Sequence, residues 1–101
     1  MQMLMKVQMP PQHFNQAVRD GTAGAKLQKI LETLKPKAAY FTAQNGCRGG
    51  ILVIDIENPS QIPFYAEPFF LYFDAQVEFM PYMSPQDLAQ AGLEKMNEMW
   101  P

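Results

Sequence analysis

Few side chains in this sequence are suited to moving a proton, and Glu67 is the foremost of them. It lies between Tyr65 and Phe69 and immediately before Pro68, so apolar surroundings are expected. A carboxyl group in such surroundings can act as a general acid or base. Alternatively, Glu67 is exposed, or it caps backbone amides freed at the proline. We predict Glu67 as the proton-transfer residue.

His13 is the only histidine, and histidine is the side chain that titrates nearest to neutral pH. A general base of the usual type, or a haem ligand, would have to be this residue, so His13 is the second predicted catalytic residue. It follows two prolines at the start of an expected helix, where a solvent-exposed position is common. One histidine and the single Cys47 cannot supply a metal site alone. We therefore predict no metal and no cofactor.

Aromatic side chains are predicted to line a ligand pocket near Glu67. The predicted lining consists of Tyr40, Tyr65, Phe70 and Tyr82. Strand alternation puts Tyr40 and Tyr82 on one face together with Thr42, Glu78 and Met80. We expect a small apolar or aromatic molecule to bind there, with the tyrosine hydroxyls as polar anchors. Sheet packing or a subunit interface is the alternative interpretation of these residues.

Composition bounds the class of protein. The chain has 101 residues, a hydrophobic share of 48%, a charged share of 18% and a net charge of −2. These values fit one folded domain over residues 1–101 and do not indicate a nucleic-acid partner. No apolar run approaches the roughly 20 residues that span a bilayer, and the start lacks the pattern of an export signal. We expect a cytoplasmic protein with no membrane partner.

The first third of the chain predicts a strand followed by two helical segments. Met3, Met5, Val7 and Met9 alternate with other residues up to Pro10. Two helical stripes follow, but they lie on nearly opposite sides of a single continuous helix. We therefore expect a break at residues 20–24. The second segment should end near Lys35, because Pro36 disfavours helix in the residue before it.

A hairpin over residues 38–57 forms the middle of the predicted sheet. Its second strand, residues 51–56, is apolar on both alternating faces. Either Leu52, Ile54 and Ile56 point inward, or Ile51 and Val53 do. Both choices leave aliphatic side chains on the outer face. Because a short chain covers one face with its own helices, we expect a second copy to cover the other.

The last part of the chain predicts a helix, a strand and a final helix. Asn58 or Ser60 can cap a helix that should kink at residues 67–68, since Pro68 removes a backbone donor. Residues 76–80 alternate as a fourth strand. Ser84 then caps one C-terminal helix that carries Leu88, Ala91 and Met96. The order is βαββαβ with a C-terminal helix, which predicts an α+β, ferredoxin-like fold with a four-stranded antiparallel sheet.

Several short stretches resemble a group of uncharacterised bacterial proteins of about 100 residues. These stretches are residues 34–41, Gly46-Cys-Arg48, residues 66–71, and Met80-Pro-Tyr-Met83 followed by Asp87-Leu88. The group is similar to the dimeric α+β barrel superfamily, whose branches include muconolactone isomerases, cofactor-free quinone-forming monooxygenases and haem-degrading monooxygenases. The resemblance implies a dimer with sheets back to back and a pocket between each sheet and its helices. It transfers no catalytic residue.

The sequence thus leads to one function and two alternatives. The leading hypothesis is a homodimer that binds a small apolar or aromatic molecule in a sheet–helix pocket, with cofactor-free isomerase or monooxygenase-type chemistry. The first alternative is a non-catalytic assembly module in which the aromatic residues are core. The second is a haem-binding or haem-degrading monooxygenase, which requires His13 to face the pocket.

Overall fold

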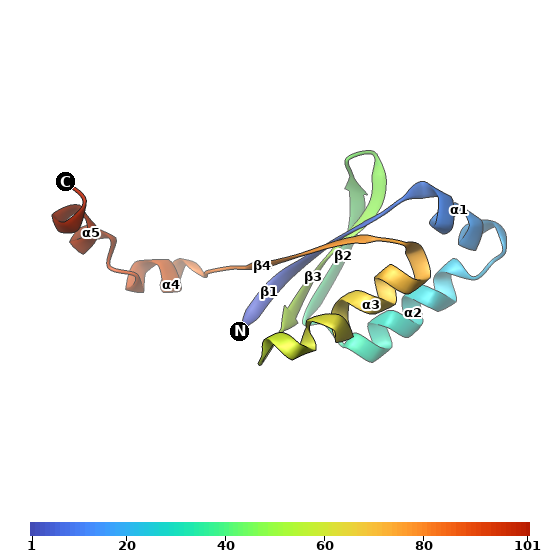
Figure 1. Cartoon of the computed structure of the whole chain (residues 1–101), viewed down its shortest axis with the longest axis horizontal. Helices are drawn as coiled ribbons and strands as arrows, with labels where there is room; N and C mark the ends of the chain where they lie inside the picture. Colours follow the sequence, from blue (N-terminus) through green and yellow to red (C-terminus); the bar gives the residue numbers. More distant parts are fainter.

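The computed structural model describes residues 1–101 and contains one four-stranded antiparallel sheet with helices on one face (Figure 1). The elements in chain order are β1 (Gln2–Met9), α1 (Pro11–Arg19), α2 (Ala23–Leu34), β2 (Ala38–Gln44), β3 (Cys47–Asp55), η1 (Pro59–Gln61), α3 (Ile62–Phe73), β4 (Gln76–Pro81), α4 (Pro85–Gln90) and α5 (Leu93–Met99). The strand order is β2-β3-β1-β4. This arrangement confirms the predicted α+β, ferredoxin-like βαββαβ fold.

The core lies between the sheet and α1, α2 and α3. Strand β1 contributes alternate residues to it, as its sequence predicted, and Met5 and Val7 have no exposed surface. Helix α3 packs Phe69 and Phe73 onto them. Phe73 also stacks on Phe14 of α1, with ring centroids 4.8 Å apart. The layer between sheet and helices is therefore filled by buried side chains.

Strand β3 has two apolar faces with different environments. Leu52, Ile54 and Ile56 are buried against the helices, whereas Ile51 and Val53 on the alternate positions are only partly buried. Pairing with the neighbouring strands extends each face across the sheet. We call the face away from the helices the outer face; its apolar residues are Leu4, Tyr40, Ile51, Val53 and Met80.

The predicted break between the first two helical segments is confirmed. Helix α1 ends at Arg19 and α2 begins at Ala23, with Gly21 between them at φ 79°. The Asp20 carboxylate accepts hydrogen bonds from the hydroxyl and the backbone N–H of Thr22. The pKa of Asp20 is lowered mainly by the hydrogen bond from the Thr22 hydroxyl. The hydrogen bond from the Thr22 backbone N–H and the charge of Lys26 lower it further, while desolvation of the carboxylate opposes these effects.

The predicted cap at Asn58 opens the short 3-10 helix η1, and α3 follows directly from η1 at Ile62. The Asn58 side chain accepts a hydrogen bond from the Ser60 backbone N–H, and the Gln61 side chain accepts one from the Asn58 backbone N–H. The sequence predicted a kink at Pro68. In the structure, α3 continues as one helix through Pro68. Its C-terminal residue is followed by Asp74 in the left-handed region, with φ 53°.

The C-terminal segment differs from the prediction of a single final helix. Gly92, at φ 76°, separates α4 from α5. Both helices lie far from the body of the molecule, and the chain ends at the tip (Figure 1). The radius of gyration is 17.2 Å, against about 13 Å expected for a compact chain of this length. We call residues 82–101 the C-terminal arm.

No helix of the molecule combines the length and the apolar character needed to cross a membrane.

Candidate functional site

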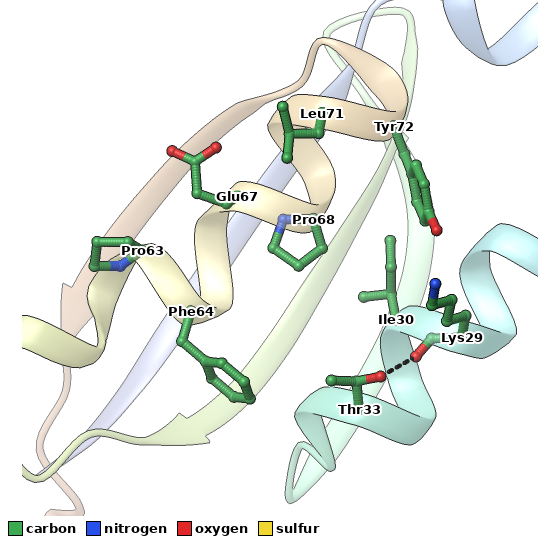
Figure 2. A pocket seen from close by; sticks show the side chains of 9 residues that line it. All are labelled: Lys29, Ile30, Thr33, Pro63, Phe64, Glu67, Pro68, Leu71 and Tyr72. Atoms are coloured by element: carbon green, nitrogen blue, oxygen red, sulfur yellow. Dashed lines mark hydrogen bonds between the residues drawn. The ribbon is translucent and has the colours of Figure 1, made fainter.

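A solvent-open groove of about 360 Å³ lies between α2 and α3 (Figure 2). It is formed on the side of these helices that faces away from the sheet. Its lining consists of Lys29, Ile30, Thr33, Pro63, Phe64, Glu67, Pro68, Leu71 and Tyr72. This volume falls within the usual range for small-molecule pockets, which begins near 300 Å³.

Helix α3 supplies the apolar wall of the groove because it is apolar on nearly all sides. Ala66, Phe69 and Phe73 form its buried stripe. Phe64, Pro68 and Leu71 follow at spacings of four and three residues, which places them along one other side of the helix. A helix with apolar residues all round is ordinarily covered on all sides. Here Phe64 is 52% exposed and Leu71 is 80% exposed, so the groove presents uncovered apolar surface.

Pro68 changes the backbone chemistry in the middle of this wall. Because proline has no N–H, the helical hydrogen bond from residue 68 to the carbonyl of Phe64 cannot form. The ring of Pro68 projects from α3 toward α2 (Figure 2). The apolar wall therefore contains the rigid ring of Pro68, and the nearby Phe64 carbonyl receives no helical hydrogen bond from residue 68.

Helix α2 supplies the polar wall. The Thr33 hydroxyl donates to the Lys29 backbone carbonyl over 2.7 Å, which fixes that hydroxyl on its own helix. The Lys29 ammonium is left as the charged group of this wall. Next to it, the Lys26 ammonium lies 5.6 Å from the centroid of the Tyr72 ring, whose side chain reaches from α3 toward α2 (Figure 2). Of these two lysines, Lys29 lines the groove, and Lys26 contacts the ring of the lining residue Tyr72.

Of the residues predicted for the site, only Glu67 lines this groove. Its side chain is exposed and points away from α2, so the carboxylate occupies the outer rim (Figure 2). Tyr65 is half-buried and donates its hydroxyl to the Asp55 backbone carbonyl over 3.3 Å. Phe70 is 40% exposed. At 100° per residue it lies on the flank of α3 opposite Pro68.

Tyr40 and Tyr82 lie elsewhere. Tyr40 is 65% exposed on the outer face, and the Tyr82 hydroxyl donates to the side-chain oxygen of Gln2 just beyond the end of β4. The strand pairing puts Tyr40 and Met80 on a common face, as predicted, but it is the face away from the helices. The single chain therefore does not bring all the predicted lining residues into one sheet–helix pocket.

His13 is exposed on α1 and lies outside the groove. Its Nδ1 atom is 4.0 Å from the nearer carboxylate oxygen of Asp74. Cys47 is half-buried at the start of β3 with a free thiol. No group of three or more His, Cys, Asp or Glu side chains lies close enough together to hold a metal ion.

Sequence reasoning missed Lys29, Phe64 and Tyr72 as lining residues. A signal was present in α3, whose twelve residues contain one charged side chain and two separate apolar stripes. The second stripe indicates a further apolar surface besides the core. No comparable signal marked Lys29, since a lysine on a helix usually belongs to a solvated face.

Comparison of the sequence with family models and with curated proteins found no match. Among solved structures, the chain is similar to the 5-chloro-2-hydroxyhydroquinone dehydrochlorinase TftG from Burkholderia phenoliruptrix AC1100, determined in complex with 2,5-dihydroxybenzoquinone. The TM-score is 0.59 at 18% sequence identity, over 85% of this chain and 97% of that one. The likeness supports the α+β, ferredoxin-like fold of this chain.

Proposed function

We propose that this chain is a homodimer that binds a small aromatic molecule in the groove between α2 and α3. The observation that carries the proposal is the groove itself, a space of about 360 Å³ with an apolar wall on α3 and the ammonium group of Lys29 on α2. The similarity to TftG, a protein determined with a bound quinone, supports a ligand of this class.

The lining defines what the ligand should look like. Phe64, Pro68 and Tyr72 offer flat surfaces against which a ring can pack. Lys29 offers an ammonium for an oxygen that carries negative charge. A planar ring with an acidic hydroxyl or a carboxylate matches both walls, whereas a purely aliphatic ligand would leave the ammonium without a partner.

Glu67 is the residue that we assign to proton transfer on a bound molecule. It lines the groove and its carboxylate stands at the outer rim, next to the apolar wall of α3. The chemistry that fits is cofactor-free isomerase or monooxygenase-type chemistry. His13 lies outside the groove, so it is not positioned to transfer a proton to a ligand there or to ligate a haem bound there.

The homodimer is supported by the outer face of the sheet. Ile51 and Val53 leave aliphatic surface there that the helices of the same chain cannot reach. Burial of such surface against a second copy is favourable, at about 25 cal/mol per Å² of apolar area. A cytoplasmic location is part of the same proposal.

Titration with 2,5-dihydroxybenzoquinone tests the ligand proposal. Amide chemical shifts in an NMR titration should change around Lys29, Phe64 and Tyr72. The variant Phe64→Ala should weaken binding at least several-fold. Phe41→Ala is the matched control, since Phe41 is 49% exposed on β2 and does not line the groove. Shift changes confined to the outer face, or equal losses in both variants, would contradict binding in the groove.

A second candidate function, a non-catalytic assembly module, is favoured by the C-terminal arm, whose apolar residues are exposed. If the groove binds neither 2,5-dihydroxybenzoquinone nor simple hydroxybenzoates while the chain still forms a homodimer, the assembly module is the better description.

A further inference from the structure

We propose that the C-terminal arm of each copy packs against a second copy of the chain, alongside the outer face of its sheet. This inference rests on the proposed homodimer and adds the segment that completes it. Seven large apolar side chains of the arm are exposed in the single chain. They are Tyr82, Met83, Leu88, Leu93, Met96, Met99 and Trp100.

The arm has few contacts that would stabilise it in the single chain. Helices α4 and α5 have 6 and 7 residues, and isolated helices shorter than about 12–15 residues are marginal in water. Helix α5 is amphipathic, because Leu93, Met96 and Trp100 at spacings of three and four residues share one side. Glu94 and Glu98 lie on the other side. A short helix of this kind needs an apolar surface to pack on.

The connection to β4 directs the arm away from its own sheet. The Tyr82 hydroxyl is bonded to Gln2 at the edge of the molecule, and Ser84 is extended, with φ −75° and ψ 165°. Pro81 and Pro85 restrict the backbone on both sides of this link. No glycine or left-handed residue lies between Pro81 and Pro85 to reverse the chain direction. An arm that leaves the sheet in this direction is free to pack against another copy of the chain.

The size of the outer face argues that the arm belongs to the interface. The four strands have 8, 7, 9 and 6 residues. At about 3.4 Å per residue and about 4.8 Å between strands, they make a flat face of roughly 500 Å². Stable protein interfaces bury about 800 Å² on each partner. A sheet face of this size forms an interface of limited extent, and the exposed apolar side chains of the arm would enlarge it from the same chain.

Trp100 gives this proposal a direct readout, because it is the only tryptophan and lies on the arm. Its side chain is 75% exposed in the single chain. In the homodimer we expect blue-shifted Trp100 emission that resists acrylamide quenching. On dilution to monomer, the emission should move to that of an exposed indole. The molar mass is measured in parallel by light scattering.

Matched variants locate the contact. Met96→Glu on the apolar side of α5 should expose Trp100 and lower the mass, whereas Glu98→Lys on its polar side should change neither. On the sheet, Tyr40→Glu and Ile51→Glu should act like Met96→Glu, and Leu71→Glu in the groove should not. Circular dichroism checks that each variant is folded, and the exposed edge-strand position of Tyr40 makes that variant the safer one.

The outcomes distinguish a failure of the proposed arm contact from a failure of the proposed homodimer. A dimer whose Trp100 is fully quenched like free indole overturns the arm contact and leaves the homodimer intact. A monomer at all concentrations overturns both. A buried Trp100 in a monomer means that the arm folds on its own chain. Emission that responds to Leu71→Glu but not to Tyr40→Glu places the arm in the groove, which also overturns the proposal.

Discussion

Leu52→Ala should lower the free energy of unfolding far more than a truncation on the other face of β3. Leu52 has no exposed surface and packs in the core that the sheet shares with the helices. Truncation of a fully buried leucine to alanine costs about 2.7–5 kcal/mol, through lost apolar burial and the cavity left behind. We expect a value near 3 kcal/mol, which lowers the melting temperature by on the order of 10–20 °C in a chain of this size.

The matched control is Val53→Ala, one residue further along the same strand on the outer face. Its side chain is only partly buried in the single chain. At a protein concentration where the homodimer is dissociated, its cost should be below about 1 kcal/mol. The cost should increase at higher concentrations, where the second copy covers the outer face.

Urea unfolding followed by circular dichroism measures both variants, provided that the m-value matches that of the parent chain. A loss below about 1 kcal/mol for Leu52→Ala, with a larger loss for Val53→Ala in the monomer, would refute the assignment of inner and outer faces. Equal losses would mean that both faces are buried within one chain.

Three further predictions concern the backbone and one cap. Gly49→Ala should destabilise the fold by about 1–3 kcal/mol, because the new Cβ would lie 2.8 Å from a backbone oxygen of β1. In contrast, a Cβ at Gly24 in α2 meets nothing within 4 Å, so Gly24→Ala should stabilise the fold by up to about 1 kcal/mol. Thermal melts compare the two, and the opposite order would refute the packing argument. Pro68→Ala should raise stability by on the order of 1–3 kcal/mol because it restores a helical donor, and a lower melting temperature would contradict this. Hydrogen bonds from the Ser84 backbone N–H and, to a smaller extent, from the Ser84 hydroxyl hold the pKa of Asp87 below its ordinary value of 3.8. The Asp87 carboxylate therefore stabilises the cap of α4 fully above pH 3.8, and this stabilisation is lost as the pH falls through the pKa of the folded state. Ser84→Ala should raise this pKa in an NMR titration, and an unchanged midpoint would rule out the hydroxyl as a cause.

Much of the fold was predictable because local chemistry and packing agree. The break near Gly21, the cap at Asn58 and the alternation of β1 all appear where the sequence placed them. The inward face of β3 was left open, since both of its alternating sets are aliphatic and only the helices decide between them. The split of the last helix at Gly92 was missed, although a lone glycine in a helical pattern often ends a helix.

The candidate site was less predictable, because it depends on which surfaces the elements leave uncovered. Strand alternation correctly grouped Tyr40 with Met80 but could not tell which face the helices cover. Glu67 was singled out by its apolar neighbours in sequence, and it reaches the groove through its place on α3. Lys29 comes to the same groove from another helix, 38 positions earlier in the chain. Sequence neighbours carry no information about such a pairing.

The molar mass of the full chain at low micromolar concentration tests most directly the claim that a second copy covers the outer face of the sheet. Size-exclusion chromatography with light scattering gives this mass independently of the elongated shape. We predict about twice the 11.5 kDa of the single chain. A mass of 11.5 kDa that persists as the concentration is raised would contradict the homodimer.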